Sequence, residues 1–334
     1  AGLGAEAGGV GARGAVGIAW GRFATRHMDV LVIGAGVSGL SAALRLLEAG
    51  HAVEIRTRAL PAETVSAVAA AIWYPYRADP VDRVLGWGAV SLREFVRLAD
   101  DPATGVVMRD GLEVFREAVD LPWWASAVPG FRRATAGELP PGYRDGYALR
   151  VPVIDMSVYL GWLGRRVEAE GGRLVRGSVA SLDEVRGEAE VVVNCTGLAA
   201  REVVRDPEVY GVRGQIQIVR APGVTRFLID DAGPTYVIPR VSDVVLGGTA
   251  DEHVDDATVD PAVAAAIRER CVRLVPELAD APVLADRVGI RPCRSTVRQE
   301  VESVGPTRVV HNYGHGGSGV TLSWGCAEEV VGLV

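Results

Sequence analysis

The first strong pattern along the chain is a short apolar run that leads through glycines into apolar residues at helical spacing. In DVLVIGAGVSGLSAALRLLEAGHAVEIRT, the run covers residues 29–33, and apolar positions then recur every three or four residues through Leu47. Gly50 ends this stretch, and a second segment typical of a strand, VEIRT, covers residues 53–57. This order predicts a strand, a tight turn, a helix and a second strand.

The turn of this unit is rich in glycine, with Gly34, Gly36 and Gly39 between strand and helix. In a Rossmann unit such glycines let the backbone approach a pyrophosphate, which rests on the helix N-terminus. A βαβ unit without a ligand is the structural alternative. The acid that usually binds the adenosine ribose after the second strand is missing, and Thr57 and Arg58 stand there. We expect these two to serve the ribose or the phosphates by hydrogen bonds.

Beyond this unit the chain does not continue as regularly alternating strands and helices. Tryptophan-rich segments are followed by a helix and strand in DMSVYLGWLGRRVEAEGGRLV, a buried strand in AEVVVNCTGLAA, and β-rich sequence in RGQIQIVRAP, TRFLIDD and TYVIPRVSDVVLGGTA. A helix is predicted over 261–274. This alternation predicts an α/β (α+β) fold, in which a Rossmann-type domain is interleaved with a substrate domain built on a mixed β-sheet. We assign 28–76, 155–202 and 288–334 to the first domain, and 77–154 and 203–287 to the second.

The chain closes with another strand, glycine turn and helix, in TRVVHNYGHGGSGVTLSWGCA. Backbone N–H groups from Gly316 to Thr321 would point at whatever lies before that helix, where negative charge is favoured by roughly 0.3–1 kcal/mol at an exposed site. A reduced flavin is negative at its N1/C2=O edge. One FAD would therefore explain both turns, with its pyrophosphate at the first and its redox ring at the last. A glycine loop that merely caps a helix is the alternative.

Composition narrows the class of function. The net charge of −7 and the pI near 5.4 argue against a nucleic-acid or anionic-membrane surface. No apolar run approaches the ~20 residues needed to span a bilayer. The four cysteines form no CxxC pair, so we expect no zinc or other metal site but reduced, buried thiols. A single bridge between Cys271 and Cys326, both on predicted helices, is the alternative.

The two ends of the chain bear on its origin. Residues 1–27 are rich in glycine and alanine without a helical period. We expect a disordered extension, an expression-vector remnant or an upstream start-site artefact, with Met28 as the effective start. All basic residues are arginine, which suggests a high-GC genome. The end of the chain, VVGLV, is no peroxisomal address, and we expect a cytoplasmic bacterial protein.

The closing segment HNYGHGGSGVTLSWGCA resembles the signature of the D-amino acid oxidases. The segments VIGAGVSGL, VAAAIWYPYRADP, VNCTGLAARE, GQIQIV, TYVIPR, LGGT and GIRPCR resemble others of this family in its order, and the resemblance runs from Met28 onward. It implies an FAD domain and a substrate domain dominated by a mixed sheet. It also implies oxidative deamination of a D-amino acid to an imino acid, which hydrolyses to a 2-oxo acid and ammonia while O₂ reoxidises the flavin to give H₂O₂.

The resemblance assigns roles to individual residues. Arg291 matches the arginine that holds the substrate carboxylate, for which a guanidinium offers two parallel N–H donors; a surface ion pair is the alternative. Tyr236 matches a tyrosine whose hydroxyl touches that carboxylate, and Gly317 a position whose carbonyl faces the substrate amine. His311 and His315 are expected to shape the loop. The expected FAD contacts are Ala35, Gly36, Val37, Ser38, Thr57, Arg58, Ser66, Ala70, Ala71, Ile72, Val179, Gly316, Gly317, Ser318, Gly319, Val320 and Thr321.

Two departures from the family pattern bear on the substrate. The stretch DDAGPT is short and has no tyrosine, so the mobile lid of mammalian members is expected to be absent or abbreviated. Ile229 stands where members specific for acidic D-amino acids place an arginine, which predicts neutral, apolar substrates. Arg226 and Arg240 lie close enough in sequence to keep a D-aspartate oxidase open.

Other classes of protein stay open from the sequence. They are a glycine- or sarcosine-type flavin amine oxidase, a nicotinamide-dependent dehydrogenase and a non-catalytic flavin-binding protein. The expected partners are the D-amino acid and O₂, without nucleic acid or membrane, and a homodimer is left open.

Overall fold

Five parallel strands form one part of the sheet in the computed structural model, which describes residues 28–75, 78–230 and 232–334. The expectations for residues 1–27 lie outside the described residues. In the order of the sheet, all neighbours are parallel. The strands are β6 (Arg173–Arg176), β2 (Ala52–Thr57), β1 (Asp29–Ile33), β7 (Val191–Asn194) and β14 (Thr307–His315). The predicted first and second strands are thus confirmed.

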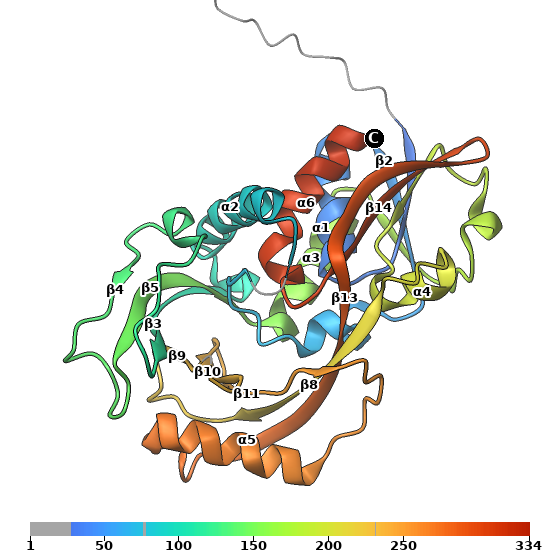
Figure 1. The fold of residues 1–334 in the computed structure, drawn as a ribbon. Coiled ribbons are helices and arrows are strands. Elements are labelled where there is room, and N and C mark those ends of the chain that lie inside the picture. Colours follow the sequence, from blue (N-terminus) through green and yellow to red (C-terminus); the bar gives the residue numbers. More distant parts are fainter. Residues whose placement is uncertain (1–27, 76–77, 231) are drawn as a thin grey trace, which may run out of the picture.

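Helices cover one face of this parallel part (Figure 1). They are α1 (Val37–Glu48), α3 (Met156–Ala169) and α6 (Gly319–Leu333), with α2 (Val81–Leu98) packed on α6. Val30 and Val32 of β1 belong to the same buried cluster as Leu40 of α1. Leu31 and Ile33 belong to a second cluster, which includes residues of η5 (Leu182–Val185) and α4 (Ala200–Val203). Because alternate side chains face opposite sides of a sheet, β1 is apolar at nearly every position.

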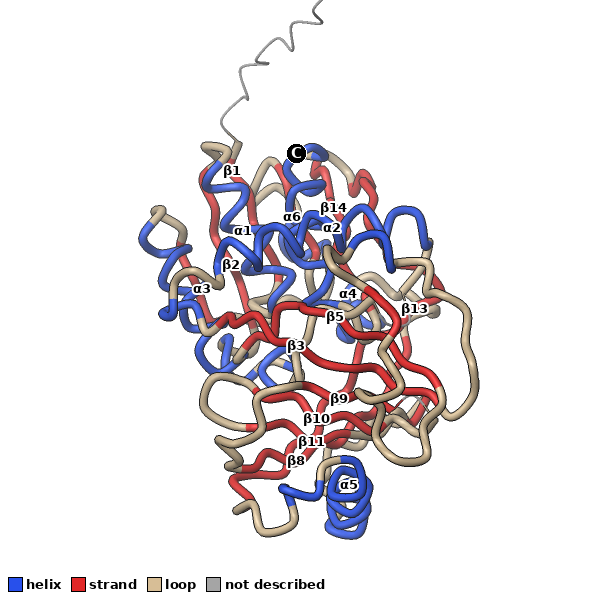
Figure 2. Tube along the Cα trace, turned by 90° about the vertical axis from the view of Figure 1, so that its left-hand side faces the viewer, coloured by secondary structure: helices blue, strands red, loops and turns tan. Residues whose placement is uncertain are grey.

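The rest of the sheet is mostly antiparallel. Its order is β4 (Arg132–Arg133), β5 (Asp145–Ile154), β3 (Val106–Phe115), β9 (Phe227–Asp230), β10 (Thr235–Pro239), β11 (Val244–Gly247) and β8 (Tyr210–Val219), with β12 (Asp251–Glu252) also on β8. Among the described residues of this part, only β3 and β9 pair in parallel. One helix, α5 (Pro261–Leu274), packs against β8, β10 and β11, and Figure 2 shows it below them. The predicted helix over 261–274 is confirmed.

A single long strand, β13 (Val283–Val304), joins the two parts of the sheet. Its first half pairs with β8 and its second half with β14, and the register shifts between Cys293 and Arg298. The strand runs past both parts in Figure 1. The predicted fold class is confirmed, whereas the division into two domains stays a prediction, and its boundary at 287/288 falls inside β13.

Short 3₁₀ helices occupy several connections. They are η1 (Pro61–Glu63), η2 (Val65–Val68), η3 (Pro102–Thr104), η4 (Ala125–Ala127), η6 (Gly197–Ala199) and η7 (Pro276–Leu278).

All four cysteines are free thiols. Cys271 on α5 and Cys326 on α6 belong to different buried clusters, so the alternative of a bridge between them does not apply. Burial raises the pKa of the Cys271 thiol to about 12, which keeps it protonated at neutral pH. Over the described ranges, histidine, cysteine and acidic side chains form no group of three that could hold a metal ion. No helix in this part of the chain has the length and apolarity to cross a membrane.

Candidate active site

One cavity of about 1470 Å³ is lined by both glycine turns. Pockets for single small ligands usually measure roughly 300–1000 Å³, so this space suits a longer ligand together with a second, smaller one. All expected site residues but one line this cavity. The exception is Ser318, which is buried and does not line the cavity. The lining contains the other expected residues: Ala35, Gly36, Val37, Ser38, Thr57, Arg58, Ser66, Ala70, Ala71, Ile72, Val179, Tyr236, Arg291, Gly316, Gly317, Gly319, Val320 and Thr321.

At the opening turn, two hydroxyl groups brace the backbone. Ala35 N–H donates to Thr57 Oγ1 at 3.2 Å, and Val37 N–H donates to Ser66 Oγ at 3.0 Å. The Thr57 hydroxyl proton is itself used on the Ala59 carbonyl, at 2.7 Å. Thr57 therefore holds the turn in shape, and the sequence alone did not indicate this role.

Other donors at the opening turn remain available to a ligand. Within the described ranges, the N–H groups of Gly36 and Ser38 have no protein acceptor. They stand at the N-terminus of α1, where the helix dipole favours an anion. Arg58 is exposed beside them on the cavity wall and has no acidic partner in the described part of the chain. The opening turn is thus equipped to bind phosphate oxygens.

At the closing turn, the backbone donors divide into two groups. Gly316 N–H donates to the Pro292 carbonyl at 3.0 Å, and Ser318 N–H donates to the His315 carbonyl at 2.9 Å, so these two are already bonded. The donors without a protein acceptor among the described residues are the N–H groups of Gly317, Gly319, Val320 and Thr321. They lie at the N-terminus of α6, as the sequence predicts for a site that binds the negative edge of a ligand.

The wall between the two turns is fixed by a segment that crosses from η2 to β5. Ala71 has a positive φ of 54°, which is unusual for a residue with a Cβ. Its carbonyl accepts from Ile154 N–H at 2.8 Å, and Trp73 N–H donates to the Pro152 carbonyl at 2.9 Å. Thr321 of α6 exchanges two hydrogen bonds with the backbone of Tyr74. This segment therefore ties the closing helix to the wall.

His315 lies in the closing turn and lines the cavity. Its side chain is almost fully buried, and burial lowers its pKa to about 4. The imidazole is therefore neutral at neutral pH. The expected role of His315 in shaping the loop stays a prediction, since its Nε2 has no partner in the described part of the chain.

At the far end of the cavity, Arg291 extends from β13. Its Nη1 donates to the Thr249 carbonyl at 3.0 Å, and no carboxylate in the described part of the chain lies within ion-pair distance of it. The guanidinium lies against Gly214 of β8, where a Cβ would overlap all three guanidinium atoms nearest to it. Glycine at position 214 leaves the space that the guanidinium occupies, and a larger residue there would force the Arg291 side chain to move. A half-buried guanidinium without an acidic partner is suited to bind an external carboxylate.

Tyr236 stands beside this arginine on the cavity wall. In the sheet it pairs with Gly247 on β11 and with Ile229 on β9. Its ring lies over Gly247 and Gly248, and a Cβ at Gly247 would overlap the ring. The glycine pair in LGGT thus makes room for the tyrosine, and Ile229 is its neighbour on the same face.

Arg226 and Arg240, the two arginines that could have bound an acidic substrate side chain, do not line the cavity. Arg226 is exposed elsewhere on the surface. Arg240 is buried and binds Asp243 through two hydrogen bonds of 2.6 and 2.7 Å. β9 ends at Asp230 and β10 begins at Thr235, so the connection between them is short, as expected.

Comparison with known proteins identifies the family. A sequence model described as FAD dependent oxidoreductase (DAO) matches residues 29–333. The chain is 53% identical to a D-amino-acid oxidase of Rubrobacter xylanophilus over 91% of this chain and 94% of the relative. It is 45% identical to a D-amino-acid oxidase of Streptomyces coelicolor over 92% and 97% of the two chains. The chain belongs to the DAO family of FAD-dependent oxidoreductases.

The fold agrees with that of a solved structure of a glycine oxidase. Glycine oxidase from Geobacillus kaustophilus superposes with a TM-score of 0.76 over 92% of this chain and 94% of that one, at 20% identity. At this identity the likeness shows the fold alone. By its sequence family the chain is therefore an FAD-dependent oxidoreductase, which disfavours the nicotinamide alternative.

The residues present fit FAD. The free N–H groups of Gly36 and Ser38 suit its pyrophosphate, and those of Gly317, Gly319, Val320 and Thr321 suit the negative edge of its ring. Both sets line the same cavity, whose volume exceeds that of a usual small-ligand pocket. The single FAD expected from the sequence therefore has a donor set at each end.

Sequence reasoning missed several residues of the DAO-family site. Thr249 and Arg270 line the cavity next to Tyr236 and Arg291. Arg270 on α5 donates through Nε to Thr235 Oγ1 at 3.2 Å and through Nη2 to the Gly248 carbonyl at 2.9 Å. Thr249 belongs to the LGGT segment, but the sequence assigned no role to it, and no local pattern marks Arg270, which reaches the site through the packing of α5.

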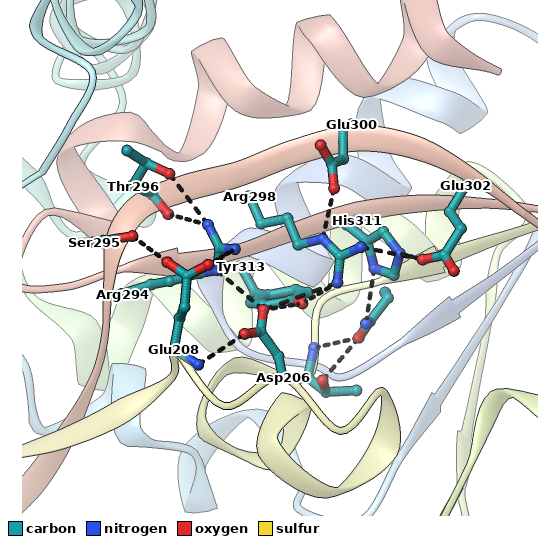
Figure 3. Close-up of polar contacts among 12 residues, drawn as sticks. Asp206, Glu208, Arg294, Ser295, Thr296, Arg298, Glu300, Glu302, His311 and Tyr313 are labelled. Atoms are coloured by element: carbon teal, nitrogen blue, oxygen red, sulfur yellow. Dashed lines mark hydrogen bonds and ion pairs between the residues drawn. The ribbon is translucent and has the colours of Figure 1, made fainter.

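A charged network borders the cavity wall at β14 (Figure 3). Asp206 accepts hydrogen bonds from the Tyr313 hydroxyl at 2.8 Å and from Arg294 Nε at 3.0 Å, and Arg298 donates to the same Tyr313 oxygen at 2.8 Å. Burial alone would raise the pKa of Asp206, but hydrogen bonds from Tyr313, Glu208 N–H and Arg294 lower it. Since Tyr313 also lines the cavity, the network fixes part of its wall.

Proposed function

We propose that the protein oxidises neutral, apolar D-amino acids to 2-oxo acids and ammonia, with O₂ reduced to H₂O₂. The observation that carries this proposal is Arg291, a guanidinium in the cavity wall that binds a carbonyl and no carboxylate of the described chain. The identity of 53% to a relative named D-amino-acid oxidase supports the choice of substrate class.

The first task of the chain is to hold the substrate carboxylate. The planar guanidinium of Arg291 keeps N–H donors free for two carboxylate oxygens, and Tyr236 stands on the same wall. The closing turn contributes the carbonyl of Gly317, which we assign to the substrate amine. Three contacts of this kind fix which face of the substrate Cα is presented, and this would select the D-configuration.

The chemistry that FAD supplies when bound is removal of the Cα hydrogen with its electron pair and return of the electrons to O₂. The lining acids at this end are already engaged. Asp230 accepts from the Tyr143 hydroxyl at 2.5 Å, and Asp251 pairs with Arg213 at 3.4 Å. No side chain is therefore assigned as general base, and the amine proton passes to solvent. The contribution of the protein is orientation and a preorganised site.

The side chain of the substrate would meet an apolar surface. Ile216 on β8, Ile229 on β9 and Ile238 on β10 line the cavity, and β10 also carries Tyr236. Arg226 and Arg240 do not reach it, which weighs against an acidic side chain. A short connection between β9 and β10 also means that product release need not wait for a long lid to open.

A substrate panel tests the proposal. The purified holoenzyme is assayed for H₂O₂ release with D-valine, D-leucine, D-aspartate, glycine, sarcosine and L-valine. We expect the highest kcat/KM with D-valine or D-leucine. A preference for glycine or sarcosine would indicate the amine oxidase alternative, and a preference for D-aspartate the acidic one. No peroxide from any of these compounds would support a non-catalytic flavin protein.

A further inference from the structure

The segment after β11 is held by two arginines from different parts of the chain. The carbonyl of Gly248 accepts from Arg270 of α5 at 2.9 Å, and the next carbonyl, that of Thr249, accepts from Arg291 of β13 at 3.0 Å. Both arginines line the cavity. Two consecutive peptide groups are thus anchored from α5 and from β13.

Thr249 is in addition anchored through its own side chain. Gln215 N–H of β8 donates to Thr249 Oγ1 at 3.0 Å. Gln215 is fully buried, and its side chain bonds the Asp260 N–H at 2.9 Å and the Asp260 carbonyl at 2.7 Å. The hydroxyl of Thr249 is therefore attached to a buried residue of β8 whose side chain is itself hydrogen-bonded to Asp260.

The same strand also sets the place of Arg291. β8 lies between β11 and β13, and its residues Gln215 and Val212 pair with Val288 and Arg291 of β13. Both ends of the contact between Thr249 and Arg291 are consequently positioned by β8. The register of β8 with β13 therefore helps to set the distance between the Thr249 carbonyl and the Arg291 guanidinium.

This contact matters because an arginine side chain has several rotatable bonds. The guanidinium is planar, so one hydrogen bond to a fixed carbonyl restricts the orientation of the whole plane. The Thr249 carbonyl is the one acceptor that the described residues offer to Arg291. If that carbonyl moves, nothing else in the described chain holds the plane for a carboxylate.

We propose that Thr249 is the positioning residue of the carboxylate site. Its hydroxyl fixes its own peptide group on β8, and its carbonyl orients Arg291 for the substrate. The assignment of Arg291 to a carboxylate rests on the proposed function. Thr249 itself acts through Arg291 and needs no contact with the substrate.

The test replaces the hydroxyl and keeps the carbonyl. Thr249→Val has nearly the same shape without the acceptor for Gln215 N–H, and Thr249→Ser restores the hydroxyl. In the holoenzyme, kcat and KM are measured with D-valine. The dissociation constant of isovalerate, which has the carboxylate and the side chain of valine but no amine, is measured from the flavin absorbance. We expect Thr249→Val to raise both KM and this constant about tenfold with kcat within threefold, and Thr249→Ser to stay within twofold of wild type.

The matched control is Thr104→Val. Thr104 is fully buried and donates to the Leu98 carbonyl at 2.9 Å, and it does not line the cavity. Loss of the Thr104 hydroxyl is expected to lower the melting temperature without changing isovalerate binding. In an Arg291→Met background, Thr249→Val should have no further effect on isovalerate binding, because the two residues act as one unit. If valine is not accommodated in the fold, Thr249→Ala removes the hydroxyl with less bulk.

Three results would overturn the proposal: isovalerate affinity unchanged in Thr249→Val or Thr249→Ala, an equal loss in Thr104→Val, or no recovery in Thr249→Ser. Failure of the proposed function is recognised separately. In that case wild-type protein oxidises no D-amino acid, whereas the isovalerate titration needs no turnover and still reports on the pair Thr249 and Arg291.

Discussion

Two arginines of the same strand have opposite surroundings. Arg298, in the second half of β13, donates to Glu300 at 2.7 Å, to Glu302 at 3.1 Å and to the Tyr313 hydroxyl. Arg291, in the first half, donates to one backbone carbonyl and has no acidic partner among the described residues. The first is a structural residue whose charge is neutralised within the protein. The second keeps its charge for a ligand.

The histidines of β14 repeat this contrast. His311 contacts Glu302 through Nε2 at 2.9 Å and Asn194 through Nδ1 at 3.2 Å. In His315, Nε2 is buried without a partner in the described part of the chain. Burial lowers the pKa of both imidazoles, although the hydrogen bond to Glu302 opposes this for His311. Arg298 and His311 thus have polar partners within the protein, whereas Arg291 and the Nε2 of His315, on the cavity wall, have no such charged or polar side-chain partner in the described part of the chain.

The largest expected effect comes from removing the uncompensated guanidinium. Arg291→Met should lower kcat/KM for D-valine by at least ~100-fold, or about 3 kcal/mol, because the substrate carboxylate loses its charged partner. The melting temperature should stay close to that of wild type. Arg298→Met is the matched control and should show the reverse, a loss of stability with kcat/KM retained. Equal kinetic losses in the two variants would remove the distinction.

The next effect concerns pH. The pKa of His315 is about 4 in the folded protein against an ordinary value of 6.5, so below pH 6.5 the unfolded chain binds a proton that the folded chain does not. Stability is therefore complete above about pH 6.5 and falls as the pH drops toward 4, by roughly 3 kcal/mol at most. Melting temperatures of wild type and His315→Asn between pH 8 and 4.5 measure this. The variant should lose less on acidification, and parallel curves would contradict the assignment.

Removing a charge from the network around Asp206 should lower the stability of the protein more than its catalytic rate. Asp206→Asn removes the charge that Arg294 and the Tyr313 hydroxyl bind, which should cost about 1–3 kcal/mol. Chemical denaturation gives the free energy of unfolding, and peroxide release gives kcat/KM. We expect kcat/KM to stay within a few-fold of wild type. A loss comparable to that of Arg291→Met would show that the network is part of the active site.

The smallest effect is expected from Tyr236→Phe. The change keeps the ring over Gly247 and removes a neutral donor that assists Arg291, which corresponds to about 1 kcal/mol or tenfold or less in kcat/KM. Steady-state kinetics with D-valine measure it. A loss larger than that of Arg291→Met would reverse the assigned order of the two carboxylate ligands.

Local patterns were sufficient for much of the fold. The glycine turn before α1, the helix over Pro261–Leu274 and the closing turn before α6 are where periodicity and glycine spacing place them. These features depend on residues close together in sequence. The expected residues of the two turns, apart from Ser318, line the cavity, and Tyr236 and Arg291, which the family resemblance indicated, line it as well.

Other features depended on the register of distant strands. Thr57 holds the opening turn instead of offering its proton to a ligand, because Ala35 and Ala59 both lie within its reach. The link from Gln215 to Thr249 arises only when β8 pairs with both β11 and β13. No pattern along the chain marks such contacts.

From the sequence alone came the turns, the flavin and the family, since short-range periodicity and glycine geometry are written into consecutive residues. The family resemblance singled out Arg291, but the reason why this arginine has no acidic partner lies in the tertiary structure. Arg291 and Arg298 are alike as residues, and only the packing of acids beside one and a lone carbonyl beside the other makes them different. Charge compensation depends on neighbours in space, and the pairing of β13 with β8 and β14 determines which neighbours each arginine has.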